Sequence, residues 1–109
     1  MSAITTHVLD TAAGSPAAGV AVRLETLAGN EWRPIAAAVT DTDGRVRDLG
    51  PEEIAAATYR LIFDTTSYFA RRPHFYPEIT VTFVVADPTQ HYHVPILLSP
   101  FGFSTYRGS

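Results

Sequence analysis

Two histidines, His91 and His93, lie two residues apart in the run HYHVPILL. Successive side chains of a β-strand point to opposite faces, so both imidazoles would share one face while Val94 and Ile96 lie on the other. The apolar face is the one that a core would bury, which leaves His93 available to a site or a partner. Because imidazole titrates near pH ~6.5, it can accept a proton from water and return one to a leaving group near neutral pH.

His7 has the same relation to its own strand-like run, ITTHVLD. Ile4, Thr6 and Val8 would share the core face and leave His7 on the other. Two histidines on the non-core faces of different strands are suited to acid–base work. The alternative is that His7 and His93 are two surface histidines without a chemical role, and the residues by themselves leave both interpretations open.

The His-x-His spacing is also compatible with a metal site, because it directs two imidazoles the same way. Zinc takes three or four protein ligands, and the chain has no cysteine to supply one. Further ligands would have to come from His7, His74 or a carboxylate that the sequence does not place nearby. We therefore predict a metal-free site, and the absence of a Gly-rich phosphate loop predicts no nucleotide cofactor.

Two other features carry groups that could bind a substrate. Arg45 follows the turn DTDG, where its guanidinium could hold an anionic or carbonyl-rich ligand through a planar fork of donors. The run YRGS at residues 106–109 offers Tyr106, Arg107 and Ser109 as a phenol, a guanidinium and a hydroxyl. A solvated arginine and a frayed tail are the alternatives that these residues leave open.

Composition narrows the class of protein. The 109 residues fit one domain over 1–109, and the lack of cysteine excludes disulfides and thiolate nucleophiles. A net charge of −3, with no basic cluster longer than Arg71-Arg72, argues against nucleic-acid and membrane partners. The first residues, MSAITTHVLD, resemble no signal peptide, and no apolar run has the length of a membrane span. We expect a soluble, cytoplasmic protein with a small-molecule substrate.

Short runs rich in β-branched and aromatic residues alternate with Gly, Pro and Asp turn signals, which predicts an all-β sandwich or barrel of about eight strands. One segment, 51–57, has a proline, two acids and then alanines, and predicts a short helix. The predicted strands are 5–9, 20–27, 32–39, 45–46, 59–64, 78–85, 91–98 and 103–106.

The faces opposite the predicted core carry apolar side chains as well as the histidines. Leu9, Pro95 and Leu97 would lie on this outer surface, which a stable monomer would usually avoid. We therefore expect an oligomer with its site at an interface.

Five segments, which together cover most of the chain, share their pattern with one protein family. They are THVLDTAAGSPAAGVAVRL (6–24), TDTDGRV (40–46), YRLIFDTTSYF (59–69), FYPEITVTF (75–83) and HYHVPILLSPFGFSTYRGS (91–109). These segments resemble the 5-hydroxyisourate hydrolases, the enzyme relatives of transthyretin. The terminal YRGS is the most discriminating piece because the hormone-carrying transthyretins end differently, and Phe103, where relatives often carry tyrosine, is a mild departure.

The resemblance implies an eight-stranded transthyretin-like sandwich, assembled as a homotetramer (a dimer of dimers) with active sites in the channel between dimers. It implies His7 and His93 as catalytic residues, with substrate bound by Arg45 and by Tyr106, Arg107 and Ser109 of the tail. The transthyretins resemble one another in carrying lysine, glutamate and threonine at the positions of His7, Arg45 and His93. The two histidines and the arginine of this chain therefore favour an enzyme over a carrier.

The implied reaction is the hydrolysis of 5-hydroxyisourate to 2-oxo-4-hydroxy-4-carboxy-5-ureidoimidazoline in urate degradation. The expected mechanism is metal-free and activates water by a general base. Which histidine is the base stays open. The alternatives are a transthyretin-like binding protein that holds a small aromatic ligand without chemistry, and a purely structural sandwich.

Overall fold

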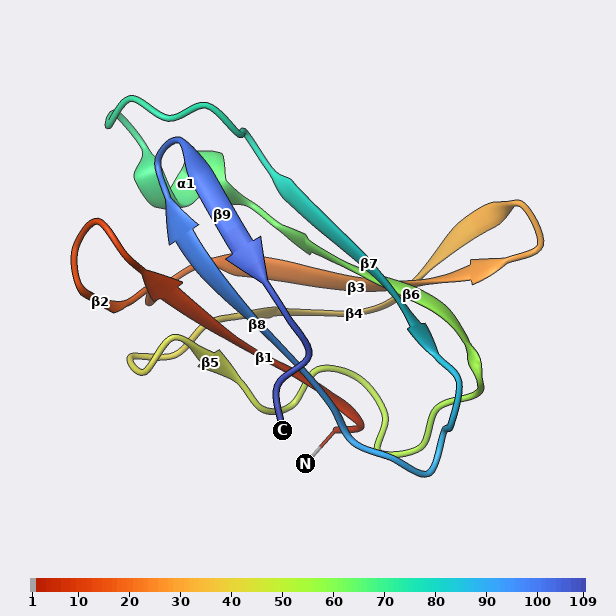
Figure 1. The fold of residues 1–109 in the computed structure, drawn as a ribbon. Coiled ribbons are helices and arrows are strands. Elements are labelled where there is room, and N and C mark those ends of the chain that lie inside the picture. Colours follow the sequence, from red (N-terminus) through yellow and green to blue (C-terminus); the bar gives the residue numbers. More distant parts are fainter. Residues whose placement is uncertain (1) are drawn as a thin grey trace.

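The computed structural model describes residues 2–109, which form two packed β-sheets and one short helix (Figure 1). The first sheet has the order β2 (Ser15–Pro16), β1 (Ile4–Asp10), β8 (Tyr92–Ser99), β9 (Gly102–Thr105), with β5 (Arg45–Val46) also paired to β1. The second has the order β4 (Glu31–Val39), β3 (Ala21–Ala28), β6 (Ala57–Phe63), β7 (Ile79–Val85).

This architecture confirms the predicted all-β sandwich, and each of the eight predicted strands is present. The two-residue β2 is an additional element that the sequence did not predict. No helix among residues 2–109 has the length and apolar character needed to cross a membrane.

Alternation along the strands correctly predicts the core face. Ile4 and Val8 of β1 and Ile96 of β8 are fully buried, while Thr80 and Val84 of β7 point outward and stay exposed. Burying one such aliphatic side chain contributes about 1.5–3 kcal/mol, so a core drawn from both sheets holds the sandwich together. Its largest fully buried members are Phe63, Phe69, Ile4, Leu24, Leu49, Leu61, Ile96 and Leu98.

The outer face of the β1–β8 sheet is less exposed than its sequence suggests. Pro95 is buried, and Leu9 and Leu97 are half-buried. The backbone of Gly108 lies against the Pro95 ring, so that part of the tail covers it. These three residues therefore do not form the exposed apolar surface that was expected to require an oligomer.

The single helix lies elsewhere than predicted: α1 spans Thr65–Phe69, and the helix expected over 51–57 is wrong. The expected segment is short, and helix nucleation is costly for short segments. Its carbonyls serve other partners, since Pro51 O accepts from Ala3 N at 3.0 Å and Ala55 O from the Tyr59 hydroxyl at 2.6 Å. Ala57 already pairs with Val85 as the first residue of β6.

The observed helix follows an N-cap residue, Asp64, which is the first residue of the segment DTTS. Asp64, predicted as the end of a strand, accepts a hydrogen bond from Ser67 N at 3.1 Å and so caps the first turn. Burial of Thr65 and Phe69 fixes the helix against the core.

A buried carboxylate joins this helix to β1. Asp10 accepts from Ala12 N at 3.0 Å, from Ala13 N at 2.9 Å and from the Tyr68 hydroxyl at 2.7 Å, with Arg72 4.0 Å away. Burial alone would raise the pKa of Asp10, but these hydrogen bonds and the Arg72 charge leave that pKa below its ordinary value. The Asp10 side chain is therefore ionised in the folded protein near neutral pH.

Replacing Tyr68 by phenylalanine tests this anchor. Tyr68→Phe removes one donor from a buried carboxylate, so the free energy of unfolding should fall by about 1–3 kcal/mol at pH 7. A carboxyl group whose pKa is lowered in the folded protein stabilises the fold above its unfolded-state pKa, and this stabilisation is lost as the pH falls through the folded-state pKa. The difference in the free energy of unfolding between Tyr68→Phe and the parent should therefore shrink below pH ~4. Denaturant unfolding at both pH values measures this, and a deficit that does not change with pH would contradict it.

Candidate active site

Three adjacent strands bring the predicted catalytic side chains together. β1 pairs antiparallel with β5, which places His7 opposite Arg45, and parallel with β8, which places Thr5 opposite His93. Directly paired residues, and residues two apart on one strand, point to the same face of a sheet. The side chains of His7, Arg45, Thr5 and His93 therefore share the outer face of the β1–β8 sheet.

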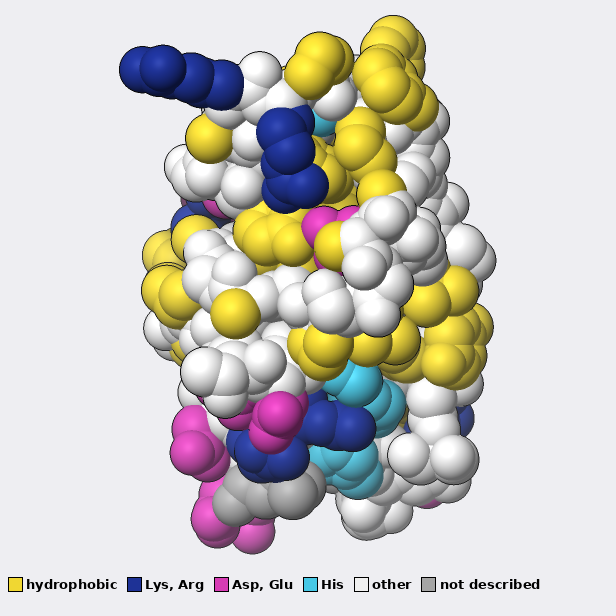
Figure 2. Space-filling view, turned by 90° about the vertical axis from the view of Figure 1, so that its left-hand side faces the viewer, with side chains coloured by type: hydrophobic (Ala, Val, Ile, Leu, Met, Phe, Trp, Pro, Cys, Tyr) yellow, Lys and Arg dark blue, Asp and Glu magenta, His cyan; other side chains and the backbone are white. Residues whose placement is uncertain are grey.

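An open pocket of about 280 Å³ lies on this face. Figure 2 shows histidine and arginine side chains side by side at one end of the molecule, with acidic side chains next to them. The pocket is lined by Thr5, Thr6, Arg45, Val46, Arg47, His91, His93 and Ser109. His7 adjoins it through its pairing with Arg45. Two guanidinium groups and the imidazoles suit an anionic, oxygen-rich ligand.

One hydroxyl connects two of the imidazoles. Thr5 Oγ1 lies 2.8 Å from His93 Nδ1 and 2.9 Å from His91 Nε2. Among residues 2–109, the structure gives His93 Nε2 no hydrogen-bond partner, so this nitrogen is left for a ligand or water. On the neighbouring strand, His7 Nε2 is 2.9 Å from the Asp43 carbonyl. Because a carbonyl only accepts, His7 carries its proton on Nε2 when neutral.

The environment of His93 favours the neutral imidazole. Burial lowers the pKa of His93, and the charges of Arg45, His7 and His91 lower it further. A neutral imidazole at pH 7 can accept a proton, which is what a general base must do.

The turn before β5 fixes the backbone that carries Arg45. Asp41 accepts from Asp43 N at 2.8 Å and from Arg45 N at 3.0 Å. The hydrogen bond from Arg45 N, the largest contribution, holds the pKa of Asp41 below its ordinary value. Gly44 has φ +74°, and a Cβ there would lie 2.3 Å from the Val8 carbonyl oxygen, so only glycine fits.

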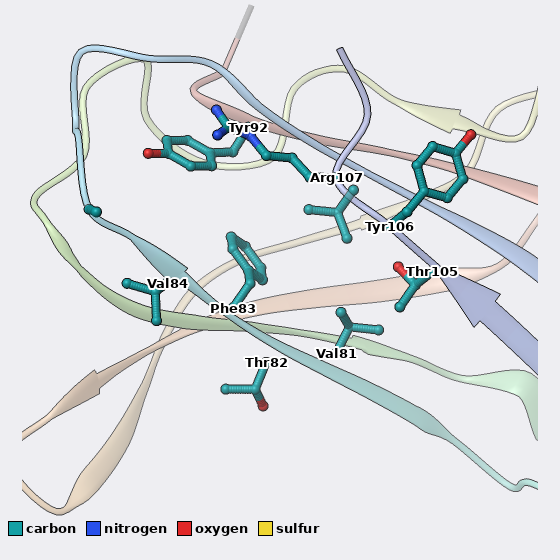
Figure 3. Close-up of a pocket in the computed structure, with 10 residues that line it drawn as sticks. Val81, Thr82, Phe83, Val84, Tyr92, Thr105, Tyr106 and Arg107 are labelled. Atoms are coloured by element: carbon teal, nitrogen blue, oxygen red, sulfur yellow. The ribbon is translucent and has the colours of Figure 1, made fainter.

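The tail is divided between two pockets. Gly108 N donates to His93 O at 2.8 Å, which brings Ser109 into the histidine pocket. Tyr106 and Arg107 instead line a second, more apolar pocket of about 380 Å³ beside β7 (Figure 3). There the Arg107 guanidinium lies 4.3 Å from the centre of the Tyr92 ring and donates to Gln90 Oε1 at 2.8 Å.

Of the predicted site residues, the structure thus brings together His7, Arg45, His93 and Ser109, and it separates Tyr106 and Arg107 from them in the single chain. Within residues 2–109, no three His, Asp or Glu side chains converge as a metal site requires. The metal-free mechanism stays a prediction.

Five residues that line the pocket were not predicted as site residues: Thr5, Thr6, Val46, Arg47 and His91. The sequence held a signal for two of them. Thr5 lies two residues before His7, and His91 two residues before His93, so strand alternation puts each on the same face as its neighbour. Alternation within single strands does not predict the pairing of β1 with β8, which is what brings Thr5 into contact with both imidazoles.

The fold and this pocket define a transthyretin-like sandwich with a histidine-arginine site. The chain matches the family model described as the HIUase/Transthyretin family over residues 4–108, and it belongs to that family. It is 47% identical over 109 residues to the 5-hydroxyisourate hydrolase of Salmonella dublin, covering 97% of this chain and 80% of the relative.

Solved structures agree with this assignment. The 5-hydroxyisourate hydrolase of Klebsiella pneumoniae has a TM-score of 0.86 and 36% identity, over 97% of this chain and 98% of that one. Sea bream transthyretin in complex with thyroxine has a TM-score of 0.89 and 32% identity, over 96% and 93% of the two chains. Backbone similarity therefore does not separate enzyme from carrier, and the site residues must.

Substitution of Gly108 tests how tightly the tail is held against the site. A Cβ at this position would lie 2.7 Å from His93 Cδ2 and 3.3 Å from the Pro95 ring, so Gly108→Ala must displace either the tail or the imidazole. Because small displacements of a reacting group cost up to ~10²-fold, we expect turnover to fall at least about tenfold while the thermal midpoint changes little. Gly102→Ala is the control, because a Cβ there would lie 3.7 Å from Ser99 Oγ, an ordinary van der Waals contact, and the backbone of Gly102 is not in the left-handed region. Parental turnover in Gly108→Ala would show that the contact does not constrain the site.

Proposed function

We propose that this chain catalyses the hydrolysis of 5-hydroxyisourate, a step of urate degradation. The observation that carries the proposal is the placement of His7, Arg45 and His93 side by side on one sheet face, in a chain 47% identical to a protein named 5-hydroxyisourate hydrolase. Two imidazoles and a guanidinium can activate water and bind an oxygen-rich anion. A carrier of an aromatic ligand needs neither.

In the proposed reaction, water adds to the carbonyl carbon of a ring amide. The new C–O bond forms and the ring C–N bond breaks, so the opened product, 2-oxo-4-hydroxy-4-carboxy-5-ureidoimidazoline, carries a ureido group and a new carboxyl group whose proton is released to solvent. His93 accepts the proton of the attacking water at Nε2, the nitrogen that faces no protein acceptor or donor among residues 2–109. That proton is then returned to the leaving nitrogen, so the base is regenerated.

The other groups have distinct proposed roles. Arg45 holds the substrate and the oxyanion that develops as water adds, because a preorganised cation stabilises that charge more than the ground state. His7, whose Nε2 is occupied by the Asp43 carbonyl, presents Nδ1 and positions the water. Ser109 adds a hydroxyl at the pocket wall.

For Tyr106 and Arg107, a role in substrate binding requires a rearrangement of the tail or a second copy of the chain. Both lie in the other pocket in the single chain, and Arg107 is held there by Tyr92 and Gln90.

We further propose that the protein acts as a cytoplasmic homotetramer, a dimer of dimers with the sites in the channel between the dimers. Exposed apolar side chains support assembly: Phe75 is 69% exposed, Phe101 67%, Val84 65% and Tyr106 56%. Val84 and Tyr106 line the same pocket, and contiguous exposed apolar surface marks sites of protein interaction. The histidine pocket is open to solvent in the single chain, and a facing copy would close it.

Loss of the base tests the activity. Freshly generated 5-hydroxyisourate decays unaided, so its ultraviolet absorbance is followed with and without protein after chelation of metals. We expect the parent to accelerate the decay and His93→Ala to lose roughly 10²–10⁴-fold in turnover while it remains folded. The matched control is His74→Gln, a histidine bonded to Thr66 and Arg72 outside the pocket. No acceleration by the folded parent would move the assignment to a ligand-binding protein.

The pH profile gives a second measure of the same group. The pKa of His93 is lowered first by burial and then by the charges of Arg45, His7 and His91. The neutral imidazole therefore persists at pH values below ~6.5, the ordinary pKa of histidine. We expect kcat/KM, measured from about pH 5 to 8, to fall only as pH drops through that lowered pKa. An acid limb centred above pH ~6.5 would assign the base to another group.

Assembly is tested by sedimentation equilibrium. With a chain mass of 11.9 kDa, we expect a species of about four chain masses at micromolar concentration. Replacing the exposed Val84 by lysine should weaken the assembly, whereas Thr80→Lys, also exposed on β7, is the control for an added charge. A parent that sediments as a single chain with full turnover would contradict the tetramer and leave the reaction in place.

A further inference from the structure

The Thr5 hydroxyl occupies a position that its burial does not explain. Thr5 is 5% exposed, yet its Oγ1 contacts two side chains, His93 Nδ1 at 2.8 Å and His91 Nε2 at 2.9 Å. A threonine that only fills space on a strand needs neither contact. Here the hydroxyl is the link between the base of the proposed reaction and a second imidazole.

Counting protons limits how this link can be arranged. A hydroxyl has one proton to donate, and a neutral imidazole carries one proton on one of its two nitrogens. In one direction, His93 Nδ1–H donates to Thr5 Oγ1, and Oγ1–H donates to His91 Nε2. In the other direction, His91 Nε2–H donates to Oγ1, and Oγ1–H donates to His93 Nδ1. If both imidazoles donated, the hydroxyl proton would have no acceptor that the structure provides among residues 2–109.

The two directions have opposite consequences for His93. In the first, Nδ1 carries the proton and Nε2 keeps its lone pair, which no group among residues 2–109 engages. In the second, Nε2 already carries the proton and Nδ1 is blocked by the hydroxyl, so the imidazole cannot act as a base at all. Only the first direction leaves a site that can accept a proton from water.

We propose that Thr5 and His91 are positioning residues that hold His93 in its Nδ1-protonated tautomer, through the chain His93 Nδ1–H to Thr5 Oγ1–H to His91 Nε2. The proposal rests on the proposed function, because it assigns a task to groups behind its base. When Nε2 takes a proton from water, His93 keeps donating through Nδ1 and no side chain has to move. The developing imidazolium is stabilised by a hydroxyl that is itself polarised by His91.

His91 is suited to the far end of this chain. Its side chain is exposed, so its Nδ1–H can be solvated while Nε2 accepts from the buried hydroxyl. The charged and titratable groups around the pair are Arg45 on β5, Arg47 after it, His7 on β1 and Arg107, which donates to the His91 carbonyl at 3.3 Å. None of them replaces the acceptor that His91 provides to Thr5.

The test compares Thr5→Val, which keeps the shape and removes the hydroxyl, with Thr5→Ser, which keeps the hydroxyl. Histidine labelled with ¹⁵N reports the tautomer of His93 without substrate, so the result does not depend on the reaction. We expect the parent and Thr5→Ser to show Nδ1 protonated and Nε2 unprotonated at about pH 8, above the ordinary imidazole pKa. Thr5→Val should shift His93 toward the Nε2-protonated form.

The value of kcat should fall in the variants that shift the tautomer of His93. For Thr5→Val we expect kcat to fall roughly tenfold with little change in KM, since one hydrogen bond of ordinary strength separates the two tautomers. Thr5→Ser should restore most of it. Thr80→Val, an exposed threonine of β7, controls for the substitution itself.

If Thr5→Val fails to fold, His91→Leu serves instead, because it removes the acceptor at an exposed position and should shift the tautomer in the same direction. A parent with Nε2 of His93 protonated, or a folded Thr5→Val with unchanged tautomer and kcat, would overturn the proposal while leaving the hydrolase assignment intact. Failure of the parent to accelerate hydroxyisourate decay would overturn the proposed function instead, whatever tautomer is observed.

Discussion

The parallel pairing of β1 with β8 is the interaction on which the rest of the structure depends. These strands are far apart in sequence, and seven consecutive residue pairs, from Ile4 with Tyr92 to Asp10 with Leu98, fix their register. The register places Thr5 beside His93, and β5 on the other edge of β1 places Arg45 beside His7. A slip of one residue would turn the site side chains into the core and the core side chains out, so burial of the apolar face also enforces the geometry of the site.

This dependence explains how much the sequence could predict. Alternation identified the strands and the core faces because it needs only neighbouring residues. It could not give the pairing, so Thr5 was not recognised as a contact of His93, and the separation of Tyr106 and Arg107 from the histidines was not foreseen. Resemblance to a family supplied site residues without supplying their geometry.

The helix shows a different limit. Composition favoured 51–57, where alanines follow a proline, but a chain of that length forms a helix only if tertiary contacts hold it. Those contacts exist at Thr65–Phe69, where an aspartate caps the first turn and a phenylalanine enters the core. Capping and burial therefore outweighed local helix preference, and the residues that provide both lie in the segment DTTSYF.

The seven residues of β1 carry three separate duties, and this limits what the strand can become. Its inward positions belong to the core, Thr5 lines the pocket and His7 adjoins it, and Asp10 binds Tyr68 of α1 at the end of the strand. Almost no position is left whose change would affect only one property. A family that keeps this sandwich while altering its chemistry would have to change the outward pocket positions of β1 together with the residues beside them on β5, β8 and the tail, and the sea bream transthyretin backbone shows how little the frame itself needs to move. New activities on this frame are thus expected to arise from combined changes at the outward positions of neighbouring strands, and not from the core positions of β1.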